Sequence, residues 1–309
     1  MSVVRAVAEL LRTGPTRFSF EFFPPKTPEG SQRLRTIIQN ELLPLEPAYV
    51  SVTYGAGGSS REQTHALVTE IQQQFGLTVV AHLTCVGSSR DEIAAILDRY
   101  AAAGVKNILA LRGDRPKRKE VLAAIANRLG PNGEGSLDFP FASDLVAFIK
   151  SRHPEMCVGV AGFPEGHPDT PNRLREMDYL RQKVSAGADY VVTQLFFENH
   201  DYFDYVSRLH LAGIDVPVVP GIMPVSSRTG IEKMSELAAG SRIPAALLRV
   251  VARAKDDAAV ARIGTHWATA QVADLLNAEV PGIHLYTLNT SRASIDICKS
   301  LGLASYRFD

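Results

Sequence analysis

The sequence predicts an α/β protein whose single domain is a (β/α)8 TIM barrel. Short apolar β-like runs alternate with helix-like runs along the 309 residues, and the β-like runs number eight. Glycines recur where a helix ends before the next strand, as at Gly104, Gly187 and Gly213. A doubly wound sheet uses the same alternation, and the count of eight strands favours the barrel over it.

The predicted elements follow one another in a regular order. A short amphipathic helix opens the chain, because Arg5 and Glu9 interrupt the apolar residues Val3 to Leu11, and this pattern is not that of a signal peptide. The predicted strands are 18–23, 49–54, 78–85, 107–111, 156–161, 190–194, 216–220 and 282–287. The predicted helices are 30–43, 62–75, 90–103, 142–152, 174–186, 202–211, more than one in 229–277, and 291–301.

Two segments depart from the repeat without dividing the chain. Residues 117–140 carry a basic run and several glycines, and they are predicted to form an extended loop after the fourth strand. The region 229–277 holds extra helices before the last strand. Since composition does not change along the chain, residues 1–309 are expected to form one barrel domain.

Composition limits the classes of function. Lys plus Arg and Asp plus Glu both total 33, which argues against a nucleic-acid or membrane partner. The cysteines Cys85, Cys157 and Cys298 show no CxxC pairing or metal-ligand spacing, so no metal site is predicted and a reducing compartment is favoured. No apolar run reaches the roughly 18 residues that span a bilayer. We therefore expect a cytoplasmic protein.

Glu21 is the first candidate for chemistry. It lies between Phe20 and Phe22 near the end of the first strand, which Pro24 and Pro25 terminate. Loss of solvation there is expected to raise the pKa of the carboxyl group toward a value suited to proton donation. Alternation turns Phe20 and Phe22 away from Glu21, so Phe23 and residues of other strands would have to shield it. An edge-strand glutamate that points at solvent is the competing interpretation.

Polar residues also follow the other predicted strands. In a barrel, the working residues lie at the carboxyl ends of the strands, where His82, Arg112, Asp114 and Gln194 are found. Arg112 suits a phosphate, Asp114 a polar heterocycle, and Gln194 an amide-bearing ring. Each has a structural alternative: a surface salt bridge for Arg112 and Asp114, and a hydrogen-bonded core histidine for His82.

Two further motifs could bind a ligand. Residues 55–60 form a glycine-rich loop, but Ser60 stands where the third glycine of a Rossmann fingerprint belongs, and the next strand lacks the ribose-binding acid. Backbone N–H groups of this loop could still contact a phosphate or a flavin. Lys183 ends a helix, where a lysine often caps carbonyl groups.

Taken together, these motifs resemble the methylenetetrahydrofolate reductase family. The matching segments run in order through nearly the whole chain, from about residue 17 to residue 302. They are Phe18-Ser-Phe-Glu-Phe-Phe-Pro-Pro-Lys26, Val50-Ser-Val-Thr-Tyr-Gly-Ala-Gly-Gly58, Ala81-His-Leu-Thr84, Leu111-Arg-Gly-Asp114, Phe163-Pro-Glu-Gly-His-Pro168, Ala186-Gly-Ala-Asp189, Thr193-Gln-Leu-Phe-Phe197, Pro220-Gly-Ile-Met-Pro224 and Leu285-Tyr-Thr-Leu-Asn289.

The resemblance implies a TIM barrel that binds FAD and takes part in one-carbon metabolism. The expected reaction is reduction of 5,10-methylenetetrahydrofolate to 5-methyltetrahydrofolate with NADH or NADPH, by ping-pong hydride transfer through FAD. Glu21 corresponds to the general acid and Asp114 to an aspartate that contacts the pterin and influences the flavin. Gln194 corresponds to a folate-binding glutamine.

The resemblance also implies two sets of binding positions. Substrate would be bound with the help of Met234, Thr290 and Arg292. FAD would be contacted by Thr53, Tyr54, Ala56, His82, Arg112, Gly113, Asp114, Ala142, Phe163, His167, Tyr179, Gln182 and Lys183.

Some of these positions depart from the bacterial pattern. Phe141 and Phe163 replace tyrosines, Tyr179 replaces an asparagine, and Gln182 replaces an arginine. Met234 replaces a phenylalanine that stacks on the ligand. Thr290 stands where a substrate-binding arginine is expected, with Arg292 two residues later.

These departures leave two rival hypotheses. The first is a barrel that passes hydride from NAD(P)H directly to the folate without flavin. The second is a non-catalytic barrel that binds folate or flavin, against which Glu21, Asp114 and Gln194 argue. The regulatory domain of eukaryotic relatives is not expected, nor inhibition by S-adenosylmethionine. A homo-oligomer is compatible with the sequence, which does not fix the oligomeric state, nicotinamide preference or an electron-supplying partner protein.

Overall fold

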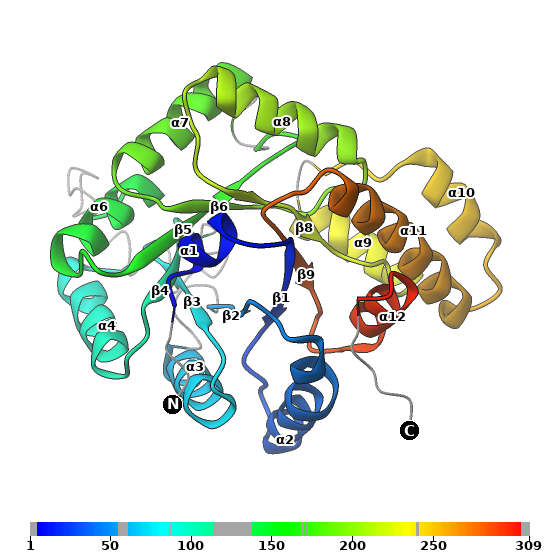
Figure 1. Ribbon diagram of the computed structural model, residues 1–309, viewed down its shortest axis with the longest axis horizontal. Helices are drawn as coiled ribbons and strands as arrows, with labels where there is room; N and C mark the ends of the chain where they lie inside the picture. The colour runs from blue at the N-terminus through cyan, green and yellow to red at the C-terminus, as the bar shows by residue number, and fades with distance from the viewer. Residues whose placement is uncertain are drawn as a thin grey trace, which may run out of the picture.

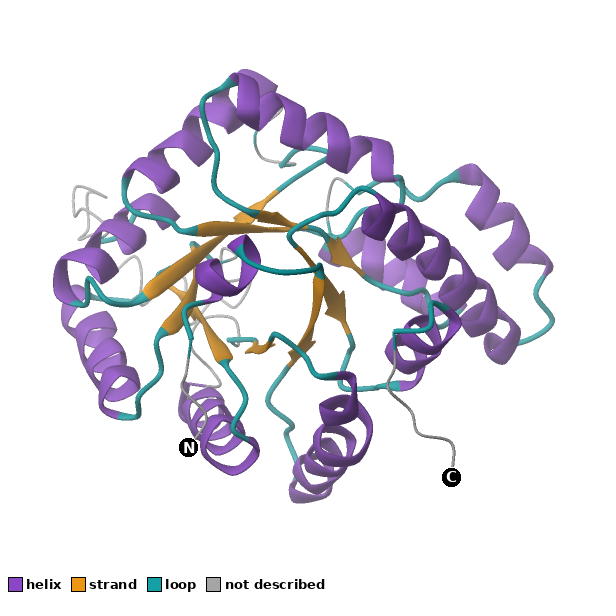
Figure 2. Ribbon diagram, viewed as in Figure 1, coloured by secondary structure: helices purple, strands orange, loops and turns teal. Residues whose placement is uncertain are grey.

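The computed structural model describes residues 5–54, 61–86, 88–113, 138–167, 170, 172–238 and 241–303. In these residues a ring of parallel strands is surrounded by helices (Figures 1 and 2). The predicted fold class, a (β/α)8 barrel, is confirmed. All paired strands are parallel, so their carboxyl ends meet at one end of the ring.

The elements have the following bounds. The strands are β1 (Arg17–Phe22), β2 (Tyr49–Val52), β3 (Val79–Thr84), β4 (Asn107–Leu111), β5 (Cys157–Gly162), β6 (Tyr190–Thr193), β7 (Val218–Val219), β8 (Gly221–Ile222) and β9 (Gly282–Tyr286). The helices are α1 (Val7–Arg12), α2 (Pro28–Ile37), α3 (Arg61–Phe75), α4 (Arg90–Ala102), α6 (Ala142–Arg152), α7 (Arg173–Ser185), α8 (Asn199–Leu211), α9 (Arg228–Leu237), α10 (Ala245–Arg253), α11 (Asp257–Asn277) and α12 (Arg292–Ser300).

Most predicted boundaries agree with these bounds to within one or two residues. The helix predicted over 30–43 differs, because α2 ends at Ile37 and continues as a π turn (Ile38–Leu42) and a 3-10 turn (Leu43–Leu45). The region 229–277 contains α9, α10 and α11, as its extra length predicted. Most of the loop predicted at 117–140 lies outside the described residues.

Local sequence signals explain where several helices begin. Side-chain oxygens of Thr27, Ser89, Asn172, Ser227 and Asp256 each accept a hydrogen bond from a backbone N–H in the first turn of the following helix. These N–H groups have no partner within the helix itself, so the cap satisfies donors that would otherwise be unpaired.

The barrel closes at a strand that Pro220 divides. The sequence predicts one strand over 216–220, and the structure instead has two short segments on either side of this proline, β7 paired with β6 and β8 paired with β9. Proline has no N–H to continue a ladder, but its carbonyl oxygen accepts a hydrogen bond from His284 N at 2.9 Å. A Cβ on Gly221 would lie 2.5 Å from Thr193 O, so this close junction requires glycine.

One end of the barrel interior is filled by apolar side chains and closed by α1. Val7, Ala8 and Leu11 of this helix pack with inward-facing residues of the strands, among them Tyr49 and Tyr190. Figure 1 shows α1 lying across the opening of the strand ring. This end is sealed, and the polar side chains around Glu21 lie at the opposite end.

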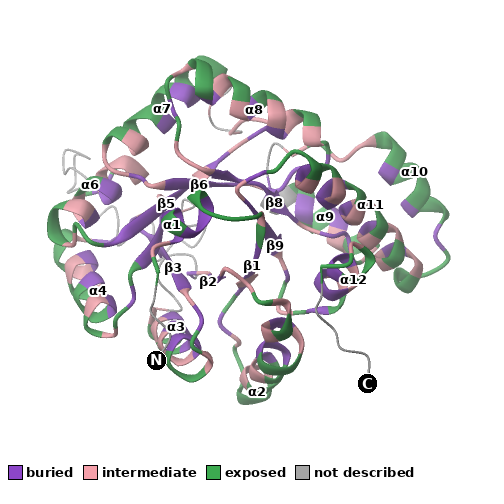
Figure 3. Ribbon diagram, in the orientation of Figure 1, coloured by how far each residue is buried: buried purple, intermediate pink, exposed green. Residues whose placement is uncertain are grey.

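A second apolar layer lies between the strands and the surrounding helices. Phe18, Phe20 and Phe22 of β1 belong to it, and all three are buried. Figure 3 shows the strands and the inner faces of the helices as the buried part of the molecule. A separate apolar cluster lies beneath α9, α10 and α11. In the described part of the chain, no helix has the length and apolar character needed to cross a membrane.

Asn107→Ala should lower the free energy of unfolding by about 2 kcal/mol. The fully buried Asn107 amide accepts from Val7 N at 2.9 Å and donates to Arg5 O at 3.1 Å, so its loss removes the partner of the buried first N–H of α1 and of a carbonyl just before the helix. Urea denaturation measures the change. Asn277→Ala, at an exposed position on α11, is the control and should change stability little. An unfolding curve of Asn107→Ala that matches the control would contradict the assigned role of α1.

Candidate active site

The polar end of the barrel is organised around Glu21. Alternate residues of a strand face opposite sides, and the burial of the β1 phenylalanines outside the ring leaves Ser19 and Glu21 inside it. Strand pairing then sets Ser51 of β2 opposite Glu21, and His284 of β9 opposite Ser19. His82 of β3 joins them from the next strand.

The Glu21 carboxylate has three polar neighbours on three other strands. Its Oε2 atom lies 3.4 Å from His82 Nε2, 3.5 Å from His284 Nε2 and 3.5 Å from Ser51 Oγ. The Glu21 side chain keeps 19% exposure, whereas those of His82 and His284 keep 8% and 2%. A ligand in the mouth of the barrel can therefore reach Glu21, while the two imidazoles lie behind it.

The environment of Glu21 differs from the expected apolar one. Burial is the largest influence and raises its pKa, but the hydrogen bond from His284 and the charges of His82 and His284 lower it by more. The net shift is downward, so the predicted rise is wrong for the protein without ligands. Phe23 is 42% exposed and does not shield the carboxyl group, contrary to expectation.

Sequence reasoning missed His284, Ser19 and Ser51. Each lies in a predicted strand, on the strand face that points into the barrel, and Ser19 and Ser51 also fall within the family-like segments. His82 was predicted, and the structure places its Nε2 in the barrel without a hydrogen bond from any described residue. Burial lowers the pKa of His82, opposed by the charge of Glu21.

The loop after β9 holds the backbone around Glu21. Thr287 Oγ1 donates to Glu21 O at 2.6 Å. The Asn289 side chain accepts from Phe23 N at 2.9 Å and donates to Phe23 O at 2.8 Å. Leu288 and Asn289 both adopt left-handed φ values, 51° and 58°. The family-like segment 285–289 thus fixes the strand end that carries the candidate acid.

The predicted FAD positions near β2, β3 and β4 are only partly described. Ala56 and Asp114 lie outside the described residues. Thr53 follows β2, whereas Tyr54 is buried in the outer apolar layer. Gly113 has φ 86°, and an added Cβ would lie 2.8 Å from Val86, so the turn that follows Arg112 requires glycine.

The remaining predicted FAD positions lie on β5, α6, α7 and their connections. Phe141, directly before Ala142 at the start of α6, stacks on Tyr179 of α7 with ring centroids 6.1 Å apart. Phe163 meets His167 edge to face at 4.7 Å. Gln182 is exposed on α7. We refer to these positions together with Lys183 as the rim beside β5.

Lys183 is the clearest candidate for holding an anion in this rim. Its Nζ donates to Ala161 O at 2.7 Å and, within the described residues, no carboxylate lies within ion-pair distance of it. Burial lowers its pKa to about 8, partly opposed by the charge of Glu176. An ammonium group has three donors, so donors remain for a phosphate oxygen. The residues present therefore fit a phosphate-bearing cofactor such as FAD.

The predicted substrate positions do not all converge on Glu21. Gln194 follows β6, and its side-chain oxygen accepts from Leu195 N at 2.9 Å. Met234 is only 3% exposed and packs in the apolar cluster beneath α9, α10 and α11. As folded here it offers little surface to a ligand, and its predicted role stays a prediction.

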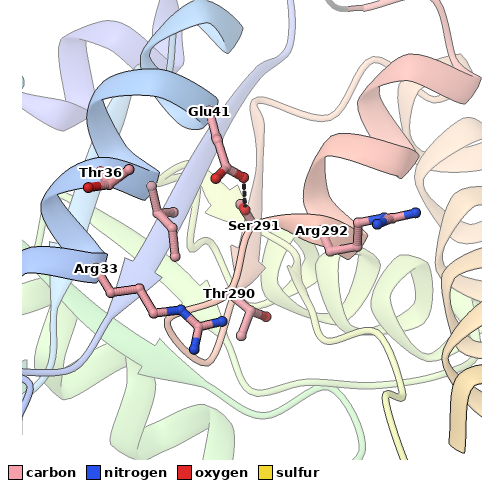
Figure 4. A pocket seen from close by; sticks show the side chains of 7 residues that line it. Arg33, Thr36, Glu41, Thr290, Ser291 and Arg292 are labelled. Atoms are coloured by element: carbon pink, nitrogen blue, oxygen red, sulfur yellow. Dashed lines mark hydrogen bonds between the residues drawn. The ribbon is translucent and has the colours of Figure 1, made fainter. Parts of the chain in front are cut away.

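Thr290 and Arg292 line a separate pocket of about 380 Å³ between α2 and the start of α12. Figure 4 shows Arg33 reaching toward Thr290, whereas Arg292 extends away from it. Arg292 Nε lies 3.2 Å from Asp296, and Ser291 donates to Glu41. Their substrate role also stays a prediction.

A larger hollow of about 810 Å³ lies between α8 and α11, lined by apolar atoms around Trp267. Neither of these two hollows is lined by Glu21. We therefore locate the candidate site by the converging polar side chains, since volume alone does not identify it.

Comparison with known proteins gives a consistent result. A family model described as methylenetetrahydrofolate reductase matches residues 6–302. The chain is 36% identical to 5,10-methylenetetrahydrofolate reductase of Escherichia coli (strain K12), covering 94% of this chain and 92% of that protein. It is also 36% identical to methylenetetrahydrofolate reductase (NADH) 1 of Arabidopsis thaliana, covering 98% of this chain and 51% of that protein. The chain thus spans about half the length of the plant relative.

Among solved structures, one neighbour is an uncharacterized protein from Clostridium thermocellum that binds two copies of 5-methyl-5,6,7,8-tetrahydrofolic acid. The TM-score is 0.64 at 14% sequence identity, covering 96% of this chain and 99% of that chain. At this identity the likeness shows the fold alone.

Asn289→Gly and Asn289→Ala separate the two roles of this residue. Both variants lose the two hydrogen bonds to Phe23, which we expect to lower the free energy of unfolding by about 1–2 kcal/mol. Alanine should cost about 1 kcal/mol more, because its Cβ disfavours the left-handed conformation. Urea denaturation gives both values, and equal stability of the two variants would contradict the assigned backbone strain.

Proposed function

The chain belongs to the methylenetetrahydrofolate reductase family, and we propose that it reduces 5,10-methylenetetrahydrofolate to 5-methyltetrahydrofolate with NADH or NADPH. The observation that carries the proposal is the partly exposed Glu21 carboxyl group at the polar end of the barrel, backed by two buried histidines. Such a group can exchange a proton with a ligand that enters the mouth. The family match supplies the substrate.

We assign the acid role to Glu21. The five-membered ring of the folate opens when one nitrogen leaves the methylene carbon, and that nitrogen needs a proton. Protonated Glu21 would donate from its carboxyl group, and the remaining iminium carbon can then accept hydride. Asp114 and Gln194 are proposed to bind the pterin, which orients the reacting carbon. Proton donation of this kind typically accelerates a reaction by about 10²–10⁴-fold.

The proposal includes FAD as the bound hydride carrier. When bound, FAD would supply a two-electron carrier that accepts hydride from the nicotinamide in one half-reaction and passes it to the folate in the other. The ammonium group of Lys183 and the guanidinium of Arg112 would hold phosphate. The other proposed contacts are Thr53, Tyr54, Ala56, His82, Gly113, Asp114, Ala142, Phe163, His167, Tyr179 and Gln182.

The relatives support nicotinamide as the reductant. The Arabidopsis thaliana protein carries NADH in its name. The Clostridium thermocellum protein of similar fold binds a methylated tetrahydrofolate, although that likeness concerns the fold alone. We propose a folate and a nicotinamide as the small-molecule partners of this chain.

A second candidate is direct hydride transfer from NAD(P)H to the folate without flavin. The observation in its favour is the rim beside β5, where Phe141 and Phe163 lack hydroxyl groups and pack against Tyr179 and His167. An absorbance spectrum of the purified protein distinguishes the candidates, because bound oxidised flavin absorbs visible light. A colourless, active protein would favour the second candidate.

Glu21→Gln should reduce methylenetetrahydrofolate turnover by about 10²-fold or more, since glutamine cannot donate a carboxyl proton. Reduction of bound flavin by NADH or NADPH should change less than about twofold. Stopped-flow absorbance measures both half-reactions. Glu9→Gln, on the exposed side of α1 at the opposite barrel end, is the matched control. Retention of the full folate rate in Glu21→Gln would show that another group is the acid.

Lys183→Met should weaken FAD binding by about 10-fold or more, as expected for a lost charge-assisted hydrogen bond. In the unchanged protein, affinity should fall as pH rises through and above about 8, because the ammonium group loses its proton there. Fluorescence titration measures both effects. Lys106→Met, at an exposed position, is the control. A pH dependence that persists in Lys183→Met would exclude Lys183 as its source.

A further inference from the structure

His284 is a buried imidazole to which the proposed function assigns no role. It lies in β9, and both of its ring nitrogens have polar neighbours. Nδ1 is 2.8 Å from Ser19 Oγ, and Nε2 is 3.4 Å from Ser51 Oγ and 3.5 Å from Glu21 Oε2. One side of the ring is therefore anchored in the barrel wall, and the other is directed at the candidate acid.

Packing fixes the orientation of this ring. Tyr49 stacks on it with centroids 5.9 Å apart and planes 12° apart, and Tyr286 meets it edge to face at 5.2 Å. The His284 backbone N donates to Pro220 O at the point where the barrel closes. Rotation of the imidazole would break these contacts, so Nε2 stays close to Glu21.

Among the described residues of this part of the barrel, few groups can change charge near neutral pH. Those that face His284 are Glu21, His82, Tyr49 and Tyr286, with Tyr190 and Cys157 deeper in the interior. Burial raises the pKa of all three tyrosines and raises that of the Cys157 thiol to about 11, so these groups keep their protons. Burial also favours neutral His82.

We propose that His284 holds the proton that Glu21 delivers to the folate, so that the Glu21–His284 pair acts as one acid. This inference rests on the function proposed above. In the step, the one proton of the pair passes from His284 Nε2 to Glu21 Oε2 and from there to the nitrogen that leaves the methylene carbon, which leaves His284 neutral and Glu21 ionised. The electron pair of the broken C–N bond stays on that nitrogen, and solvent later returns one proton to the pair.

The arrangement explains how Glu21 can be charged in the free protein and still act as an acid. The histidine neighbours favour its charged form, yet a general acid must carry a proton when the folate reacts. If the proton resides on His284 in the free protein, it is available across a 3.5 Å gap when a bound ligand displaces water from the mouth. His284 is thus a positioning residue that acts through Glu21.

The test is the pH profile of methylenetetrahydrofolate turnover in His284→Gln. Glutamine can keep a hydrogen bond toward Ser51 and Glu21 but cannot hold the proton. We expect kcat to fall about 10-fold at pH 7.5 and the alkaline decline of kcat to move to lower pH by about one unit. Activity should recover as pH falls, because Glu21 then takes its proton from solvent directly. His153→Gln, at a histidine paired with Asp98 on the outer surface, is the matched control.

If the pH profile of kcat in His284→Gln has the same shape as that of the wild type, the proposal is overturned, whatever the absolute rates are. If this variant does not fold, Ser19→Ala removes the Nδ1 contact and should move the same decline in the same direction, and an unmoved decline would again overturn it. Histidine NMR adds a direct readout, since Glu21→Gln should shift the ring resonances of His284, and unchanged resonances would also overturn the proposal. A wild-type chain without turnover would instead contradict the proposed function itself.

Discussion

Closure of the parallel strand ring is the constraint on which the site depends. Ring closure brings β9 beside β1, so that His284 lies next to Ser19 and Glu21, more than 260 residues away along the chain. At the point of closure, the segments on either side of Pro220 pair with different strands, β7 with β6 and β8 with β9, and the proline carbonyl accepts from His284 N.

The two ends of the barrel differ in character: one is apolar and closed, and the other is polar and open to ligands. Apolar side chains and α1 fill one end, where Asn107 accepts from the N–H of Val7, the first residue of the helix. The polar groups are thereby held at the mouth, where ligands can approach. Burial of Glu21 beside histidines is costly only if the charges are unpaired. The network of Ser19, Ser51 and His284 supplies the missing partners.

The loops around the mouth are attached to the strands by specific side chains. Thr287 and Asn289 bind the backbone on either side of the Glu21–Phe23 turn. On the other side, Glu165 accepts from Arg242, which also contacts Asp201 at 2.7 Å. Both arrangements link segments that are distant in sequence. These contacts hold the loops at the ends of the strands against one another.

The alternation of strands and helices, the placement of Glu21 on the strand face opposite Phe20 and Phe22, and the motifs that identify the family could all be predicted from the sequence. These features follow from local periodicity and from short segments. The tertiary structure alone decided the division at Pro220, the meeting of Glu21 with His284, and the downward direction of the Glu21 pKa shift. Each of these depends on neighbours from three or four different strands, whose distances a linear pattern does not contain. The burial of Met234 and the outward placement of Arg292 were decided in the same way.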